Sequence, residues 1–324
     1  MSSTYCIVRA LAASTLLAAG IAFADTGTLP EWAFPISAPA GTPPPDDGTQ
    51  LTVPGSDAKF TRTQLRDFFT PPDWYPQDHP QMPVLVGHGA KPDSFACGFC
   101  HLPSGLGRPE NAPIAGLPAS YIVRQVQEMA TGVRKSALPD RYPQALMTKV
   151  AIQAVHEQGL EEAAAYFASL KHTSTSKVVE ADTIPKVEIT HWILKKSDGD
   201  ATEALGNRMV EVPDDFSRFL LRDGHLTYTT YVPTGSIARG EKLATTGGDG
   251  KTVACAICHG ADLKGLGFVP PIAGRSPSYI ARQLFDMRAG ARNGEGAALM
   301  KAVVAQLSND DIVAITAYVA SRQP

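Results

Sequence analysis

Apolar residues recur at steps of three and four along two stretches of the chain, and this spacing predicts that both stretches are mostly helical. The last predicted helix carries its apolar side at Ile312, Ile315 and Val319. Ser308 can cap its start, because Asp311 stands three residues later, where it completes a capping box. The pattern therefore predicts a mainly α-helical chain.

Two glycines are predicted to end earlier helices. Gly132 follows a helical pattern that begins near Tyr121, and Gly290 follows one that begins near Tyr279. Glycine adopts the left-handed conformation that commonly closes a helix. Each helix is therefore expected to end just before its glycine.

The remaining sequence has a different character. Residues 25–60 are rich in Pro, Gly, Ser and Thr, and residues 68–83 add aromatics and prolines, which predicts an extended arm that wraps against the first helical domain. Residues 178–180 and 187–194 show β-branched, alternating character, and residues 208–212 could pair with them. We expect a short β-rich insertion here.

An internal repeat organises the two helical stretches. Cys97-Gly98-Phe99-Cys100-His101 recurs 158 positions later as Cys255-Ala256-Ile257-Cys258-His259. The further matches pair Gly105-Leu106-Gly107 with Gly265-Leu266-Gly267, Ala112-Pro113-Ile114 with Pro270-Pro271-Ile272, Ser120-Tyr121-Ile122 with Ser278-Tyr279-Ile280, and Ala145-Leu146-Met147 with Ala298-Leu299-Met300. Two homologous domains in tandem are therefore predicted. The expected boundaries are a signal peptide at 1–24, the Pro-rich arm at 25–90, a first domain at 91–172, a β-rich insertion at 173–235 and a second domain at 236–324.

The beginning of the chain is typical of an export signal. Arg9 precedes an apolar run, and small residues at Ala22 and Ala24 predict cleavage before Asp25. Of the five cysteines, four belong to the repeated motif and the fifth, Cys6, lies in this signal. No later apolar run approaches the roughly 20 residues of a membrane span. A soluble periplasmic protein is the expectation.

Charge argues against nucleic acid as a partner. The formal net charge is −3, and removing residues 1–24 takes away Arg9 alone among the charged groups, which gives −4. A basic patch would be the expected footprint of a nucleic-acid-binding protein, and the sequence shows none.

The repeated motif is the covalent attachment signature of haem c. Two thiols separated by two residues can form thioethers to the porphyrin, while the adjacent imidazole coordinates the iron from one face. Cys-x-x-Cys also occurs in zinc sites, thioredoxin-like redox pairs and disulfides. Because both copies end in histidine, we predict two haem c groups, attached at Cys97 and Cys100 and at Cys255 and Cys258.

The second axial ligand of each iron decides between electron carriage and chemistry at the metal. Met147 lies 46 residues after His101, and Met300 lies 41 residues after His259, each immediately before a predicted helical run. We expect these methionines to be ligands together with the two histidines. Met129 and Met287 are also paired across the repeats, but they fall inside predicted helices, where core packing is the better account.

Together these motifs resemble the class I cytochrome c family, and the tandem arrangement resembles its two-domain dihaem members of the cytochrome c4 type. The resemblance covers about 97–170 and 255–322. It implies a mainly α fold of two tandem class I cytochrome c domains, with His/Met-ligated haems that carry single electrons between periplasmic or membrane-bound partners such as a dehydrogenase, an oxidase or another cytochrome. It does not account for the Pro-rich arm or the insertion.

One departure from the family concerns the backbone carbonyl that orients the haem histidine. The family has a proline there, which Pro270 matches, whereas Ala112 takes this place in the first domain. A backbone carbonyl of either residue can accept the bond. Four paired arginines could also bind the haem propionates, because guanidinium matches carboxylate geometry; they are Arg124, Arg134, Arg282 and Arg292.

Two other functions remain open. Dihaem cytochrome c peroxidases also carry two such motifs, and they need one open iron; a first domain without Met147 as ligand could provide it, or His79, His88 or His156 could bind instead. The chain could also be the electron-accepting subunit of a larger dehydrogenase, docked through the arm and the insertion. A fully ligated iron leaves outer-sphere electron transfer as the available reaction, so we predict a carrier and not an enzyme.

Overall fold

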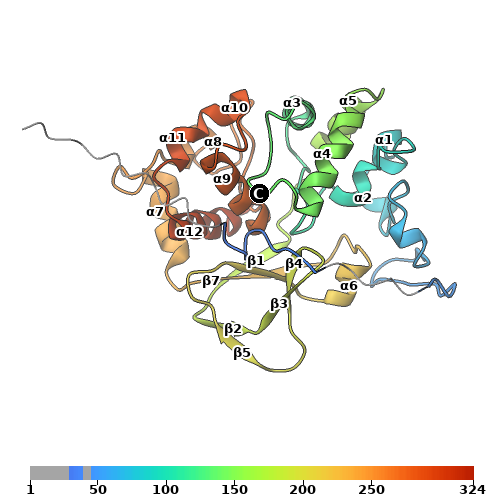
Figure 1. Ribbon diagram of the computed structural model, residues 1–324, viewed down its shortest axis with the longest axis horizontal. Helices are drawn as coiled ribbons and strands as arrows, with labels where there is room; N and C mark the ends of the chain where they lie inside the picture. Colours follow the sequence, from blue (N-terminus) through green and yellow to red (C-terminus); the bar gives the residue numbers. More distant parts are fainter. Residues whose placement is uncertain (1–28, 39–44) are drawn as a thin grey trace, which may run out of the picture.

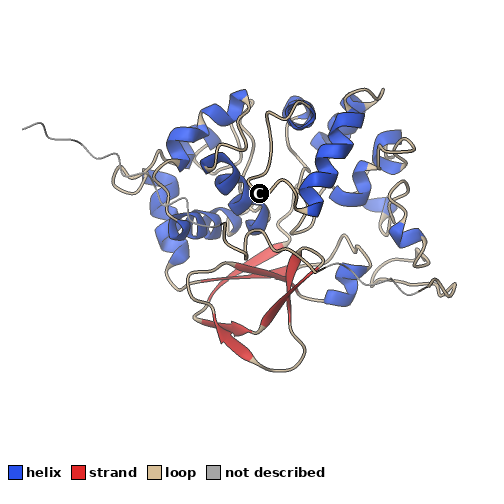
Figure 2. Ribbon diagram, viewed as in Figure 1, coloured by secondary structure: helices blue, strands red, loops and turns tan. Residues whose placement is uncertain are grey.

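The computed structural model describes residues 29–38 and 45–324. The predicted export signal, with Cys6 and the cleavage position before Asp25, lies outside the described residues. Within them, two groups of helices stand side by side above a strand-rich region (Figures 1 and 2). No helix in this part of the chain combines the length and the apolar character needed to cross a membrane.

Each helical group is built around one copy of the repeat. The first contains α1 (Val84–Gly87), α2 (Cys97–His101), α3 (Ala119–Ala130), α4 (Tyr142–Ala154) and α5 (Leu160–Ser169). The second contains α7 (Ser236–Thr246), α8 (Cys255–His259), α9 (Pro277–Arg288), α10 (Glu295–Ala298), α11 (Met300–Val304) and α12 (Asn309–Ala320). The mainly helical expectation is confirmed.

The predicted helix ends are also confirmed. Ser308 and Asp311 form a capping box at the start of α12, with the Ser308 hydroxyl accepting from the Asp311 amide. Gly132 and Gly290 follow the last residues of α3 and α9 with φ of 74° and 70°. These local signals suffice because the capping groups lie within a few residues of each helix end.

The strands and α6 (Phe216–Leu220) lie between the two repeats in the chain. They are β1 (Ser176–Glu180), β2 (Thr183–Pro185), β3 (Val187–Thr190), β4 (Ile193–Lys196), β5 (Thr202–Ala204), β6 (Val210–Pro213) and β7 (Tyr228–Val232). One sheet has the order β1-β7-β6, with β1 parallel and β6 antiparallel to β7. The pairs β2 with β5 and β3 with β4 form two antiparallel ribbons.

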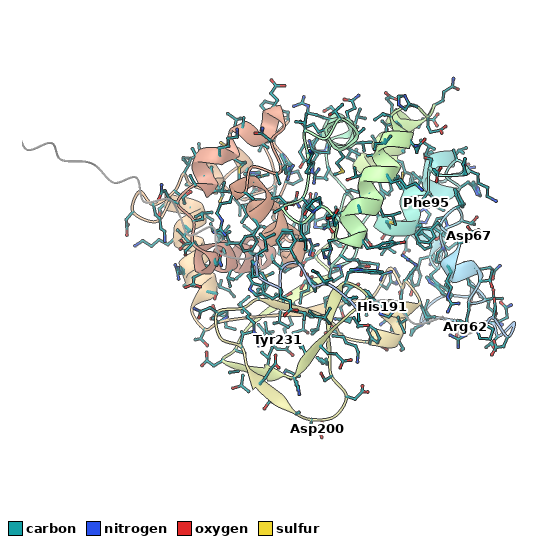
Figure 3. The ribbon with its side chains drawn as sticks, in the orientation of Figure 1. Arg62, Asp67, Phe95, His191, Asp200 and Tyr231 are labelled. Carbon is teal, nitrogen blue, oxygen red and sulfur yellow. The ribbon has the colours of Figure 1, made fainter. Side chains whose placement is uncertain are left out.

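The strand partners predicted from the sequence are wrong. Residues 187–196 fold back on themselves as β3 and β4, because His191 and Trp192 adopt positive φ at the turn. Strand β6 then pairs with β7 instead. Figure 3 labels His191 at this turn and Tyr231 on β7.

The arm was expected to wrap the first domain, and residues 29–38 do not follow this expectation. Ala33 and Phe34 are buried in the core of the second repeat, where the Trp32 and Phe34 rings lie 5.8 and 6.1 Å from the ring of Phe285. The blue trace of these residues crosses between the strands and the second repeat in Figure 1. Apolar contact with α9 thus overrides proximity in the sequence.

The later part of this region does pack beside the first repeat. Two short 3₁₀ turns occur at Gln64–Arg66 and Pro76–Asp78. The Phe68 ring lies 4.7 Å from that of Phe95, labelled in Figure 3, and 4.5 Å from that of Phe99 on α2. Residues 68–95 therefore pack against α2.

Candidate functional site

The four cysteines of the repeated motif lie on the short helices α2 and α8, and none of them forms a disulfide. Burial raises the pKa of Cys97 to about 12 and that of Cys255 to about 11, so both are protonated thiols when unmodified. A zinc site needs further ligands, and no group of three or more His, Cys, Asp or Glu side chains converges among the described residues.

The histidine of each motif is held by one backbone carbonyl. His101 Nδ1 lies 2.8 Å from the carbonyl oxygen of Ala112, and His259 Nδ1 lies 2.8 Å from that of Pro270. The bond made by Ala112 is thus as short as that made by proline. Burial lowers the pKa of both imidazoles, which favours the neutral form with Nδ1 as donor and Nε2 free to bind a metal.

The loop after each histidine follows a constant offset of 158 residues, which corrects one sequence match. The amide of Gly107 donates to the carbonyl of His101, and that of Gly265 donates to the carbonyl of His259. Gly107 is therefore equivalent to Gly265 and not to Gly267. Gly105 corresponds to Leu263, which adopts a φ of 62°. The match based on identical residues was misleading, because the two loops repeat a backbone conformation and not the residue types.

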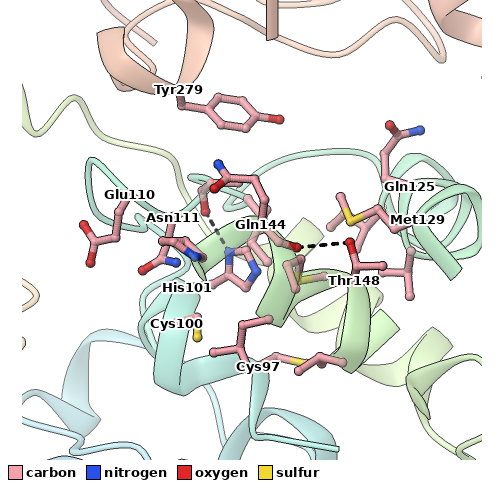
Figure 4. A pocket seen from close by; sticks show the side chains of 18 of the residues that line it. Cys97, Cys100, His101, Glu110, Asn111, Gln125, Met129, Gln144, Thr148 and Tyr279 are labelled. Carbon is pink, nitrogen blue, oxygen red and sulfur yellow. Dashed lines mark hydrogen bonds between the residues drawn. The ribbon is translucent and has the colours of Figure 1, made fainter. Parts of the chain in front are cut away.

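A cavity of about 370 Å³ opens beside Cys97, Cys100 and His101. Its wall is mainly apolar and includes Ile114, Leu117, Ile122, Val126, Leu160 and Phe167. In Figure 4, Met129 approaches from α3, and Tyr279 of the second repeat lies across from His101. An apolar cavity next to two thiols and a neutral imidazole suits a covalently attached haem.

The position of Met147 differs from the expectation. It lies inside α4 and not in a loop before it, and it lines the cavity together with Met129. In the second repeat, Met300 begins α11, and both Met300 and Met287 pack against the core of that repeat. Neither the cavity lining in the first repeat nor the core packing in the second separates the two pairs of methionines.

The alternative histidine ligands are not at the cavity. His88 and His156 are exposed, and His79 is bound to Asp73 and to the carbonyl of Pro80. His101 is the one histidine among the residues that line the cavity. The structure thus gives no support to ligation of the first haem by any of these three histidines.

Two of the predicted arginines meet where the repeats face each other. Arg134 donates to Gln125 at 2.8 Å and to Gln283 at 2.9 Å, while Arg292 donates to the same two glutamines at 2.9 Å. Arg292 also donates to Tyr121 at 2.7 Å. The match of Tyr121 with Tyr279 was visible in the sequence, but its role appears only when the repeats are brought together.

This cluster suits an anion. Both guanidinium groups are buried, and no described carboxylate lies within ion-pair distance of either; Arg292 Nε has no hydrogen-bond partner. Burial would raise the pKa of Tyr279, but Arg134 and Arg292 lower it, which reflects the local positive field. Buried cations with only neutral partners are costly, so the carboxylates of a haem fit here.

The other two predicted arginines are not equivalent. Arg282 is buried, lines the cavity and donates to the carbonyls of Ala33 and Pro109. Arg124 is exposed and does not line the cavity, although it takes the same place in the repeat. A propionate contact from Arg124 therefore has no support in the structure.

The same face of the two repeats is covered to different extents. Phe99 of α2 is 2% exposed, whereas its equivalent Ile257 on α8 is 68% exposed. Likewise Arg108 and Glu110 are buried, while the equivalent Leu266 and Phe268 are 63% and 66% exposed. Sequence reasoning missed this difference because the covering residues come from outside the repeats.

Comparison with known proteins agrees with this picture. The family model described as Cytochrome c matches residues 237–323. Cytochrome c4 of Azotobacter vinelandii is 28% identical over 227 residues, which cover 69% of this chain and 82% of the relative. Cytochrome c-554(548) of Halomonas halodenitrificans is 38% identical over 77 residues, 24% of this chain and 93% of the relative. A thiosulfate dehydrogenase electron acceptor of Thiomonas intermedia is 23% identical over 238 residues, 72% and 81% of the two chains.

Proposed function

Because the chain belongs to the cytochrome c family and carries two haem c groups, we propose that it is a periplasmic dihaem electron carrier with His/Met ligation at both irons. The observation that carries this proposal is the equivalent setting of His101 and His259, each held through Nδ1 at 2.8 Å by a backbone carbonyl. This setting leaves Nε2 of both imidazoles available for iron.

The chain's own residues have three tasks in this function. The cysteines would hold the cofactor covalently, His101 with Met147 and His259 with Met300 would bind the irons, and Arg134 with Arg292 would balance the propionate charge. When bound, the haem supplies an iron that gains and loses one electron. With histidine and methionine both bound to each iron, no substrate would need to bind at the metal.

The contact between the repeats supports electron exchange within the chain. Tyr279 and Gln283 of the second repeat line the cavity of the first, and Arg134 pairs with Arg292 in an isolated antiparallel bridge. Arg134 and Arg292 share Gln125 and Gln283 as partners, so propionates bound by the two arginines would meet one set of side chains. We infer that the two haems lie close enough to exchange electrons without separation of the repeats.

An absorption spectrum of the oxidised holoprotein tests the ligation. We expect a thioether-to-iron charge-transfer band with the intensity of two haems, and two one-electron steps in a redox titration. High-spin features at one haem would instead favour a peroxidase-like enzyme with an open iron. A bis-histidine spectrum would contradict the role given to the methionines.

A second candidate function is electron acceptance from a dehydrogenase. It is favoured by the Thiomonas intermedia relative, whose name states this role, and by the exposed apolar face of the second repeat. We propose that Ile257, Leu266 and Phe268 form this contact, since exposed apolar patches commonly mark interaction sites. The first repeat cannot offer the same face because this chain covers it.

Charged substitutions in this face test the second candidate. Phe268→Glu and Ile257→Glu should each slow reduction of the holoprotein by thiosulfate dehydrogenase by about tenfold, since a carboxylate is costly in an apolar contact. Val84→Glu is the matched control, because Val84 is 67% exposed on the first repeat. Stopped-flow absorption measures the rate. Equal rates in all variants would argue against this contact.

A further inference from the structure

Arg222 belongs to neither repeat, yet it reaches the first haem site. It lies in the loop between α6 and β7 with a φ of 59°. This loop is fixed on both sides of Arg222. Trp74 Nε1 donates to the carbonyl of Leu221 at 2.8 Å, and the Tyr75 hydroxyl donates to Asp223 at 3.0 Å. Trp74 and Tyr75, which precede the first repeat, therefore fix the backbone position from which the Arg222 side chain extends.

The guanidinium contacts the helix that carries the haem cysteines. Arg222 Nη1 donates to the carbonyl of Phe99 at 2.8 Å, and the group lies 3.6 Å from the centre of the Phe99 ring. Phe99 stands directly before Cys100, and Arg222 forms part of the cavity wall beside both. A positive charge is thus placed at the cysteine side of the first haem.

This charge is not balanced by its neighbours. Arg108 and Glu110 lie nearby and form a buried ion pair of 2.8 Å, which cancels their two charges. No described carboxylate lies within 4.0 Å of the Arg222 guanidinium. Burial lowers the pKa of Arg222 to about 9, so the side chain is still protonated at neutral pH. The cluster carries one net positive charge.

The equivalent place in the second repeat is exposed and carries apolar residues. Ile257 replaces Phe99 and is 68% exposed, and Leu266 and Phe268 replace Arg108 and Glu110. Water therefore reaches this side of the second repeat, where it screens charge. The two haems differ here in both local charge and burial.

Reduction adds an electron to a haem, so a partly buried, unbalanced cation beside it favours the reduced state. We propose that Arg222 raises the reduction potential of the first haem above that of the second, so that the first haem is the one reduced in the half-reduced chain. This proposal rests on the proposed function, since it orders the potentials of the same two haems.

Redox titration of the holoprotein tests the proposal. Arg222→Gln should lower the first haem's potential and reduce the equilibrium constant for electron transfer from the second haem to the first by about tenfold, or 59 mV for one electron. Arg222→Lys keeps the charge and should retain most of the wild-type value. Glu110→Gln removes the negative partner of Arg108 and should raise the potential of the first haem.

Met300→His assigns the two redox steps to the two haems, since histidine in place of methionine lowers the second haem's potential.

Arg208→Gln is the matched control, because Arg208 lies in the same inserted region but pairs with Glu203 at 2.9 Å and does not line the cavity. It should leave both potentials unchanged. Equal shifts in Arg222→Gln and Arg222→Lys would show a packing role only, and an unmoved first step would refute the proposal. The proposed carrier function has a separate test: it would be refuted if redox titration of the wild-type holoprotein did not show two one-electron steps.

Discussion

Met147→Ala should remove about half of the thioether-to-iron band of the oxidised holoprotein, while Met129→Ala should leave the band at full intensity. The two side chains are a matched pair, because both line the first cavity and both lie inside helices. Loss of a thioether ligand also lowers the potential of that haem, by on the order of 0.2 V within the range of about 0.8 V that axial ligands set. Optical redox titration measures both effects.

The second repeat gives an independent version of this experiment. Met300→Ala should remove the other half of the band, and Met287→Ala should leave it intact, although both methionines pack against the same core. If Met129→Ala or Met287→Ala were the variants that lose the band, the ligand assignment would be reversed. If no variant lost it, sulfur would not be a ligand at all.

The sequence predicted those features that depend on neighbouring residues. The capping box of α12, the glycine ends of α3 and α9, and the spacing of the Cys-x-x-Cys-His motif all involve groups within a few positions of each other. The internal repeat supported the same prediction, since each helical pattern occurs twice. Interactions between neighbouring residues were therefore enough to predict the helices and the cofactor.

Features that depend on distant contacts could not be predicted in this way. Phe34 packs against Phe285, about 250 positions later in the chain, and no periodicity near Phe34 indicates this partner. Strand β6 pairs with β7, while its expected partners pair elsewhere: β1 with β7, and β3 with β4. Strand pairing depends on tertiary context more than on residue type.

The electrostatic features of the site have the same origin. Arg134 and Arg292 were predicted to bind haem propionates, but their shared contacts with Gln125 and Gln283 arise only from the meeting of the repeats. Arg222 gave no signal in the sequence, because the repeat contains no equivalent of it. Comparison of the two repeats cannot identify a functional residue that lies in an inserted segment.

The crossing of α7 and α12 offers the test with the largest expected effect on stability. These helices pack closely at Gly240, where an added Cβ would lie well inside contact distance of the Ala314 carbonyl oxygen and 2.8 Å from Cβ of Tyr318. One neighbour is a backbone oxygen and the other is a Cβ atom, so neither can move away by a side-chain rotation. Gly240→Ala must push the helices apart.

We therefore expect Gly240→Ala to lower the free energy of unfolding by about 3 kcal/mol, at the upper end of the usual cost of overpacking a core. Gly296→Ala is the matched control, because Gly296 lies in α10 with no atom within 4 Å of the added Cβ. It should be neutral or more stable by up to about 1 kcal/mol. Urea unfolding followed by circular dichroism measures both. Equal stability of the two variants would mean that α7 and α12 can separate at little cost, and the close crossing would then not hold the second repeat together.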